Sequence, residues 1–284
     1  MTKEYNLGLI GSPVSHSISP FIHKAMLALA GLKGNYQLFD IDEKLLRERF
    51  QELKDRLDGI NITIPHKVAC LDLVDELSSE AHLIGAINTI SFAGKTVCGY
   101  NTDIYGFQKS QEREDSFLTS CLVYGYGGAS RAVCLALLNL GARNIFVTGR
   151  SRKRSRLFVE NLQGTFLAQG KKQNIALFEN QDDYSLLVNC APLGQSEAVN
   201  EQFGKLVKNM DGAGGAFLHD LVYSKNRKQK TPVCQLADSH GIKSKDGFDM
   251  LVYQAMRAFQ IWTGVEVSHS KLIERLENEL SMSN

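Results

Sequence analysis

Hydrophobic and polar residues follow two different periods along this chain of 284 residues. Short apolar runs at residues 7–11, 122–124 and 144–148 are typical of strands. Residues 132–140 and 21–32 are instead typical of helices, the latter with an apolar repeat at Phe21, Ala25, Leu29 and Leu32. Strands that alternate with helices predict an α/β fold.

The clearest alternation covers residues 59–64. Ile60, Ile62 and Ile64 occupy every second position, so we expect them to share one face of a strand. Asn61 and Thr63 should then project together from the other face. A strand of this kind would present two polar side chains side by side.

Residues 120–156 predict a strand, a glycine turn, a helix, a second strand and a cationic cluster. Gly141 should end the helix in a left-handed conformation. A pyrophosphate can approach backbone N–H groups closely where no Cβ intervenes, and a helix N-terminus adds positive charge. The turn has Gly125 and Gly127 of the G-x-G-x-x-G pattern but Ser130 at its third glycine. An ordinary strand-turn-helix remains the alternative to nucleotide binding.

A cluster of cations follows the second strand, where an NAD-binding unit usually carries an acidic residue. Its members are Arg150, Arg152, Lys153, Arg154 and Arg156. A guanidinium can hold a phosphate through two parallel bonds, so the cluster favours the 2′-phosphate of NADP. The alternative is a solvated basic start of a helix.

The composition excludes several other classes of protein. A formal net charge of +1 and 22% charged residues argue against nucleic acid or an anionic membrane surface as partner. No segment has the length of a membrane span, and residues 1–5 lack the basic start and apolar core of a signal peptide. The six cysteines are scattered without a C-x-x-C pair, which predicts reduced thiols in a cytoplasmic protein and no structural metal site.

Ser17 and Ser19 lie in a turn dense in hydroxyl groups just before the helix at 21–32. Such hydroxyls, together with backbone N–H groups, can hold a carboxylate. Ser19 is equally well placed to cap the helix, with Pro20 at its first position.

Three further polar positions have two interpretations each. Lys67 follows the strand-ending Pro65 at a turn or helix start that disfavours a cation, so it is either exposed and indifferent or held there for chemistry. Asn88 is a candidate site residue or an ordinary turn residue. Asp103 is a candidate site residue or a helix N-cap.

In their order along the chain, these stretches resemble the shikimate dehydrogenase family over nearly the full length. The substrate-side blocks are His16-Ser17-x-Ser19-Pro20, Asn61-x-Thr63-x-Pro65-x-Lys67, Gly85-Ala86-x-Asn88-Thr89 and Gly99-Tyr100-Asn101-Thr102-Asp103. The other blocks are residues 125–130, residues 150–154, Asn189-Cys190-Ala191-Pro192-Leu193-Gly194, Asp220-Leu221-Val222-Tyr223 and Gly247-Phe248-x-Met250-Leu251-Val252-x-Gln254-Ala255. Departures from the family pattern occur on the cofactor side at Tyr126, Gly149, Cys190-Ala191 and residues 224–228.

The resemblance implies reversible hydride transfer between NADPH and the ring carbonyl of 3-dehydroshikimate, which gives shikimate. It implies catalytic roles for Lys67 and Asp103. It also implies a substrate site made of Ser17, Ser19, Asn61, Thr63, Lys67, Asn88, Asp103, Tyr223 and Gln254. The implied cofactor contacts are Gly125, Tyr126, Gly127, Gly128, Ala129, Ser130, Gly149, Arg150, Ser151, Arg154, Leu221 and Gly247.

Gln254 belongs to a helix whose apolar residues repeat at intervals of four and three. We expect that apolar face to be core: Phe248, Val252, Ala255, Phe259 and Trp262. Gln254 lies off this face, which suits either a substrate contact or ordinary exposure.

The expected architecture has two α/β domains. Residues 1–103 and 247–284 form a substrate domain completed by C-terminal helices, and residues 104–246 form an inserted Rossmann-type domain that binds NADP. The substrate would lie in a hinged cleft between them, in a monomer or a homodimer. The rival functions are an NAD-linked quinate/shikimate dehydrogenase and a non-catalytic metabolite sensor.

Overall fold

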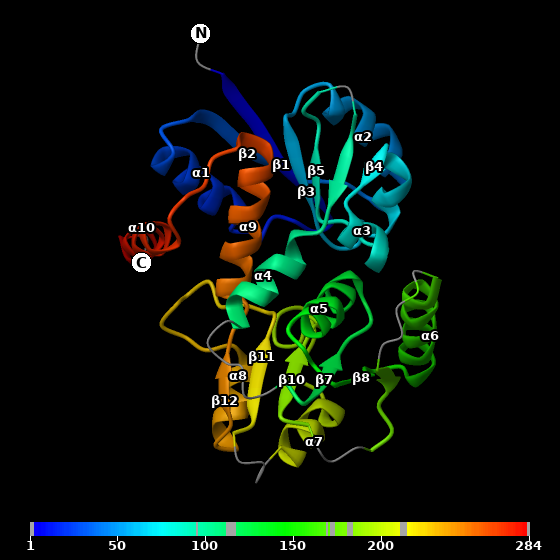
Figure 1. Ribbon diagram of the computed structural model, residues 1–284. Coiled ribbons are helices and arrows are strands. Elements are labelled where there is room, and N and C mark those ends of the chain that lie inside the picture. Colours follow the sequence, from blue (N-terminus) through cyan, green and yellow to red (C-terminus); the bar gives the residue numbers. More distant parts are fainter. Residues whose placement is uncertain are drawn as a thin grey trace. The chain divides into compact units, whose positions relative to one another are not determined.

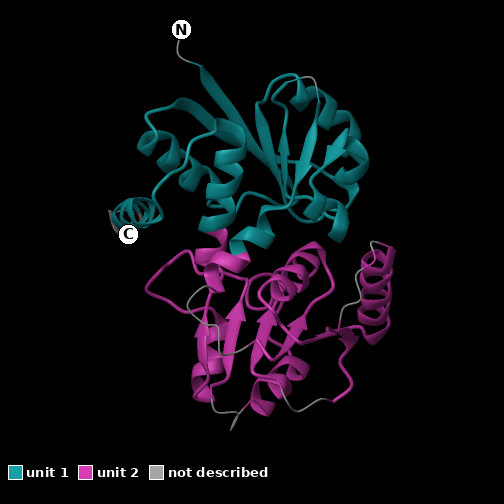
Figure 2. Ribbon diagram, in the orientation of Figure 1, with its two compact units in different colours: residues 1–106, 252–284 teal, residues 107–251 magenta. Residues whose placement is uncertain are grey.

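The structure is a computed structural model that describes residues 3–94, 96–111, 118–168, 170, 174–180, 184–210 and 215–282. The chain forms two compact units, coloured separately in Figure 2. Unit 1 comprises Met1–Gly106 and Val252–Asn284, and unit 2 comprises Phe107–Leu251. Two helices, α4 (Thr102–Gln111) and α9 (Phe248–Thr263), continue from one unit into the other.

Unit 1 is built on a mixed six-stranded sheet of order β2-β1-β3-β5-β6-β4 (Figure 1). Its strands are β1 (Glu4–Gly11), β2 (Lys33–Asp40), β3 (Gly59–Ile62), β4 (Glu76–Leu77), β5 (Thr89–Ser91) and β6 (Cys98–Tyr100). Its helices are α1 (Ser19–Leu29), α2 (Leu46–Lys54), α3 (Ser79–Ile84) and α10 (His269–Met282), with short 3₁₀ turns η1 (Glu43–Leu45) and η2 (Ala69–Leu73). Strands β3 and β5 are antiparallel, with Asn61 opposite Thr89, so polar side chains from distant parts of the chain become neighbours.

Strand β3 is shorter than the alternation of isoleucines predicted. Ile60 and Ile62 are buried, but Ile64 is 66% exposed, so its expected place on the same strand face is wrong. The N–H of His66 donates to the carbonyl of Thr63, and this turn reverses the chain before the alternation can continue. The turn, residues 64–68, therefore carries Lys67 out of the strand.

Helix α1 begins one residue earlier than the capping hypothesis requires. Ser19 is its first helical residue, and the cap position belongs to Ile18, which makes no side-chain cap bond. The Ser19 N–H donates to Ser17 Oγ at 3.2 Å, and the Ser19 hydroxyl accepts from the same Ser17 Oγ at 3.0 Å. The buried face of α1 includes Ile22 and Met26.

Helix α9 packs against the unit 1 sheet through Trp262. The indole Nε1 donates to the Ile90 carbonyl at 2.9 Å, and a Cβ on Gly59 would lie only 2.1 Å from the same nitrogen. Only a glycine leaves room for this contact. The core face predicted for α9 is confirmed, because Phe248, Val252, Ala255, Phe259 and Trp262 are all buried.

Unit 2 contains an all-parallel sheet of order β12-β11-β10-β7-β8-β9. Its strands are β7 (Ser120–Tyr124), β8 (Asn144–Thr148), β9 (Ile175–Leu177), β10 (Leu186–Asn189), β11 (Phe217–Asp220) and β12 (Lys243–Lys245). The helices between them are α5 (Gly128–Asn139), α6 (Arg152–Ala168), α7 (Glu201–Asn209) and α8 (Pro232–Ser239). The strand order reverses between β7 and β10, which is the switch point of a doubly wound Rossmann-type sheet and the usual place for a ligand. The two-domain α/β fold predicted from the sequence is confirmed.

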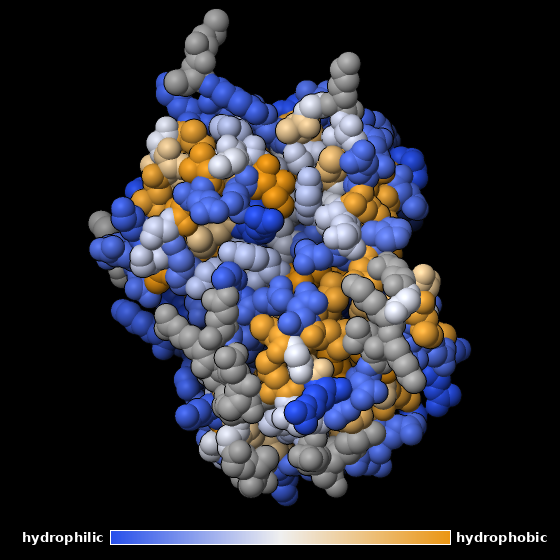
Figure 3. All heavy atoms as spheres, viewed as in Figure 1, coloured by the Kyte–Doolittle hydropathy of each residue, from blue (hydrophilic) through white to orange (hydrophobic). Residues whose placement is uncertain are grey.

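The predicted strand-turn-helix-strand of unit 2 is also confirmed. Strand β8 has the expected bounds, and α5 ends just before Gly141, whose φ of 89° is left-handed. Within the described residues, every helix is too short or too polar to cross a membrane. Figure 3 shows hydrophilic residues interspersed with apolar ones on the face in view.

Candidate active site

Lys67 and Asp103 form a largely buried ion pair in unit 1. The distance from Lys67 Nζ to Asp103 Oδ2 is 2.5 Å, and the two side chains are only 14% and 8% exposed. The hypothesis of an exposed, indifferent lysine is therefore wrong. Asp103 is not a helix N-cap either, because it lies in the first turn of α4 and its own N–H donates to Asn101 Oδ1 at 3.2 Å.

Asn88 holds the other carboxylate oxygen of Asp103. Its Nδ2 donates to Asp103 Oδ1 at 2.8 Å, while its Oδ1 accepts the backbone N–H of Thr102 at 2.7 Å. A backbone N–H can only donate, so this bond fixes which way the amide points. Asn88 is thus a buried partner of Asp103 and not an ordinary turn residue.

Gln254 completes this cluster from helix α9. Its Oε1 lies 3.4 Å from Asn88 Nδ2 and 3.4 Å from Thr102 Oγ1, and the residue is 8% exposed. The alternative of ordinary exposure is wrong. Thr102 was not singled out from the sequence, although it directly precedes Asp103.

Asn61 lies on β3 and bonds across to β5. Its Nδ2 donates to the Asn88 carbonyl at 3.2 Å and to Thr89 Oγ1 at 3.0 Å. Its Oδ1 accepts the Tyr36 hydroxyl at 2.7 Å. Thr63 follows β3, is half-buried and donates its N–H to Ile10.

Ser17 and Ser19 form a hydroxyl pair before and at the start of α1. Ser17 Oγ donates to Ser19 Oγ at 3.0 Å. The capping role considered for Ser19 is not what the structure shows, and this pairing leaves hydroxyl groups at a helix start, where an anionic group is favoured.

The glycine turn of unit 2 connects β7 with α5, at the carboxyl edge of the parallel sheet. Gly125 has φ of 133°, and a Cβ there would lie 3.0 Å from Ser130 Oγ and 3.1 Å from Cys190 Cβ. The turn therefore brings backbone close to the end of β10. Helix α5 starts at Gly128, and its first turn is Gly-Ala-Ser-Arg, without a carboxylate. Backbone N–H groups and a helix N-terminus of this kind fit a pyrophosphate.

Two departures from the family pattern touch each other in unit 2. A Cβ on Gly149 would lie 2.8 Å from Cε1 of Tyr126. The tyrosine ring thus occupies the space that a side chain at position 149 would need. The bulky residue in the glycine turn and the glycine after β8 are therefore sterically complementary.

The cationic cluster lies at the end of β8 and in the first turns of α6. Arg150 pairs with Glu197 at 3.1 Å, and Arg152 pairs with Glu179. The N–H of Arg154 donates to Ser151 Oγ at 3.3 Å. The positive end of a helix dipole repels cations at the helix N-terminus. A bound phosphate would interact favourably with both the cations and the dipole. The cluster therefore fits the 2′-phosphate of NADP.

The remaining residues expected to contact the cofactor lie in the segments that follow β11 and β12. The N–H of Leu221 donates to the Asn189 carbonyl at 2.9 Å, and the N–H of Gly247 donates to the Val222 carbonyl at 3.0 Å. A Cβ on Gly247 would lie 2.2 Å from the Leu221 carbonyl oxygen, so glycine is required at this crossing. Tyr223 is half-buried in the segment that follows.

Asp220, at the end of β11, links these segments through hydrogen bonds. It accepts Asn189 Nδ2 at 2.7 Å, Thr231 Oγ1 at 2.6 Å and the Val222 N–H at 3.1 Å. Burial nevertheless raises the pKa of the Asp220 carboxyl to about 7; the three hydrogen bonds oppose this rise, and nearby Asp246 adds to it.

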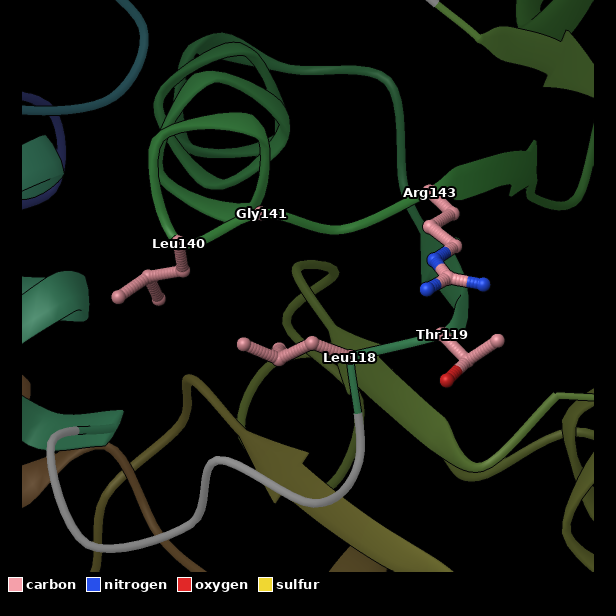
Figure 4. Close-up of a pocket in the computed structure, with 5 residues that line it drawn as sticks. All are labelled: Leu118, Thr119, Leu140, Gly141 and Arg143. Atoms are coloured by element: carbon pink, nitrogen blue, oxygen red, sulfur yellow. The ribbon is translucent and has the colours of Figure 1, made fainter.

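A pocket of about 210 Å³ in unit 2 lies away from all these residues (Figure 4). It is lined by Leu118, Thr119, Leu140, Gly141 and Arg143, at the amino ends of β7 and β8. The glycine turn and the cationic cluster follow the carboxyl ends of the same strands, so this pocket is not the candidate site. The described residues contain no group of acidic, histidine and cysteine side chains suited to a metal ion.

Two family models match the chain. Residues 9–90 match the shikimate dehydrogenase substrate binding domain, and residues 247–276 match the shikimate 5′-dehydrogenase C-terminal domain. The first match contains Ser17, Ser19, Asn61, Lys67 and Asn88, and the second contains Gln254.

Individual relatives cover nearly the whole chain. A shikimate dehydrogenase (NADP(+)) of Geobacter metallireducens is 36% identical over 271 residues, which are 92% of this chain and 91% of that protein. The structure of shikimate 5-dehydrogenase from Thermus thermophilus in complex with NADP(H) and shikimate is 29% identical, with a TM-score of 0.78 and coverage of 96% and 99%. Quinate dehydrogenase from Corynebacterium glutamicum in complex with NAD is 26% identical, with a TM-score of 0.81 and coverage of 99% and 100%.

The raised pKa of Asp220 predicts how stability depends on pH. Because the folded-state pKa of about 7 exceeds the ordinary value of 3.8, the folded protein binds the extra proton between these values. The free energy of unfolding should therefore fall as pH rises from about 4 to about 7, by at most about 1.4 kcal/mol per pH unit from this group, and then level off. Urea unfolding of the wild type and of Asp220→Asn, repeated across this pH range, gives the difference in their free energies of unfolding. We expect the wild type to lose stability relative to Asp220→Asn as pH rises. If the wild type instead gains stability relative to the variant, the hydrogen bonds to Asp220 outweigh the effect of its burial on the pKa.

Proposed function

This chain belongs to the shikimate dehydrogenase family, and from that premise we propose that it is an NADP-dependent shikimate dehydrogenase that reversibly reduces 3-dehydroshikimate to shikimate. The observation that carries the proposal is the buried pair of Lys67 and Asp103, 2.5 Å apart and held by Asn88. A protein that only sensed a metabolite would have no need of a buried proton donor, which costs free energy to desolvate.

Lys67 is the group that handles the proton. NADPH supplies the hydride when bound, and reduction of the ring carbonyl leaves negative charge on its oxygen. Lys67 Nζ donates a proton to that oxygen and takes it back in the reverse direction. Asp103 and Asn88 keep the ammonium at one position, so that orientation costs little in the reaction.

The substrate contacts follow the chemistry of the side chains. Ser17, Ser19 and Tyr223 hold the carboxylate of shikimate. The ring hydroxyls bond Asn61, Thr63, Lys67, Asn88, Asp103 and Gln254. A site of this kind selects by hydroxyl pattern, because an analogue that lacks a hydroxyl leaves a buried polar group unpaired.

NADP is held by the carboxyl edge of the unit 2 sheet. Residues 125–130 and the start of α5 bind the pyrophosphate, and Gly149, Arg150, Ser151 and Arg154 bind the 2′-phosphate. Leu221 and Gly247 would make further contacts with the cofactor. Residues 1–103 with 247–284 thus act as the substrate domain and residues 104–246 as the NADP domain, in a cytoplasmic enzyme.

One assay tests the function and its main rival. The purified protein is mixed with shikimate or quinate and with NADP or NAD, and the absorbance of the reduced nicotinamide is followed. We expect the highest kcat/KM for shikimate with NADP. Preference for quinate with NAD would identify the protein as a quinate dehydrogenase, and absence of turnover with all four pairs would leave only a binding function.

Replacing Lys67 tests the proton donor. Lys67→Ala should lower kcat for shikimate oxidation by about two orders of magnitude or more, with only a modest rise in KM, because proton transfer is lost while the hydroxyl contacts of the other residues remain. Lys44→Ala, which removes an exposed lysine from the same unit, is the control and should behave as the wild type. Near-normal kcat for Lys67→Ala would exclude Lys67 from the chemistry.

Replacing Arg150 tests the phosphate site. Arg150→Ala should weaken NADP binding about tenfold or more and leave NAD binding nearly unchanged, since only NADP carries the 2′-phosphate. Calorimetric titration with each cofactor measures this without turnover. Arg143→Ala is the matched control, because Arg143 lies at the opposite end of β8. Equal losses for NADP and NAD would refute the assignment of Arg150.

A further inference from the structure

Tyr36 reaches the substrate side of unit 1 from β2, the edge strand of the sheet. Leu7 of β1 pairs with Tyr36, and Leu9 of β1 pairs with Asn61 of β3, so Tyr36 and Asn61 are separated by one strand. The phenol spans this gap, and its hydroxyl donates to Asn61 Oδ1 at 2.7 Å. The mechanism described above gives Tyr36 no role.

The ring of Tyr36 is fixed by stacking. His23 of α1 lies parallel to it, with ring centroids 4.2 Å apart and planes at 7°, and Trp262 lies 6.5 Å away at 47°. Burial lowers the pKa of His23 to about 3, so the imidazole is neutral. Apolar contacts on several sides therefore hold the hydroxyl at one place.

The Tyr36 hydroxyl remains a donor under all working conditions. Burial raises the pKa of the phenol well above its ordinary value, so the hydroxyl keeps its proton. Tyr36 therefore donates this proton to Asn61 Oδ1.

These bonds join Tyr36 to the buried ion pair. In sequence, the side chains donate from Tyr36 to Asn61 (2.7 Å), Asn61 to Thr89 (3.0 Å), Thr89 to Asn88 (3.0 Å) and Asn88 to Asp103 (2.8 Å). Tyr36 begins the series on β2, and Asp103 ends it in the first turn of α4. Because Asn61 Oδ1 accepts from Tyr36, the Asn61 Nδ2 is directed at Thr89, which fixes the orientation of the amide.

Resting on the function proposed above, we infer that Tyr36 is a positioning residue that sets the affinity for shikimate by orienting the Asn61 amide. It contacts the residue that is assigned to a ring hydroxyl. It makes no contact with Lys67, so the proton transfer does not depend on it.

Tyr36→Phe removes only the hydroxyl. Asn61 Oδ1 then loses its donor, so the amide is free to turn away from the substrate. We expect KM for shikimate to rise roughly tenfold, with kcat within about threefold of the wild type. The dissociation constant of NADP, measured by calorimetry without shikimate, should not change.

Tyr5→Phe is the matched control. Tyr5 packs in the same cluster beside Leu7 and Trp262 but lies outside the series of bonds, so KM for shikimate should stay at the wild-type value. Asn61→Ala removes the same bond from its other end and is the second variant if Tyr36→Phe does not fold. Adding Tyr36→Phe to Asn61→Ala should raise KM by clearly less than tenfold, because the shared bond is already lost.

The outcomes separate this inference from the proposed function. An unchanged KM for Tyr36→Phe in a protein whose wild type oxidises shikimate would overturn the role of Tyr36 alone. Equal proportional losses in KM, kcat and NADP affinity would show a merely structural role and also overturn it, as would full additivity in the double variant. A wild type without shikimate turnover would overturn the proposed function, and the role of Tyr36 with it.

Discussion

The buried pairing of Lys67 with Asp103 is the interaction on which the rest of unit 1 depends. Two charges that are only 14% and 8% exposed have lost most of their hydration, at an effective cost of several kcal/mol for each ion. A contact of 2.5 Å recovers part of this cost. The bond from Asn88 and the one between Asn101 and the Asp103 N–H satisfy further atoms of the aspartate. The hydrogen bonds from the surrounding amides are therefore necessary for this ion pair to be stable when buried.

The need for these hydrogen bonds constrains the register of the unit 1 sheet. Asn61 reaches Thr89 only because β3 and β5 are antiparallel with these two residues opposite each other. A slip of one residue would turn Asn61 to the other face of the sheet. Trp262 stabilises the register, because its indole bonds the Ile90 carbonyl and packs on Gly59. The last part of the chain thus keeps the polar network of the first part in place.

In unit 2 the main constraint is the close approach of backbone segments at the carboxyl edge of the sheet. Gly125 and Gly247 each sit where a Cβ would meet neighbouring atoms, and Gly149 makes room for the ring of Tyr126. Asp220 ties the loops after β10 and β11 together through Asn189 and the Val222 N–H. The departures at positions 126 and 149 are compatible with the fold because one provides the space that the other fills.

The sequence by itself determined the features that depend on near neighbours: the strand-turn-helix-strand at β7, α5 and β8, the left-handed end at Gly141, and the core face of α9. Local periodicity and backbone conformation are sufficient for these. It left Lys67 and Gln254 undecided, misplaced Ile64, and gave no sign of Tyr36, which lies in a strand with alternating exposure. Their burial and partners are set by residues far away in the chain, up to 166 positions in the bond between Asn88 and Gln254. Only the tertiary structure decides such contacts, because the free energy of a polar side chain depends on the groups that surround it once water is excluded.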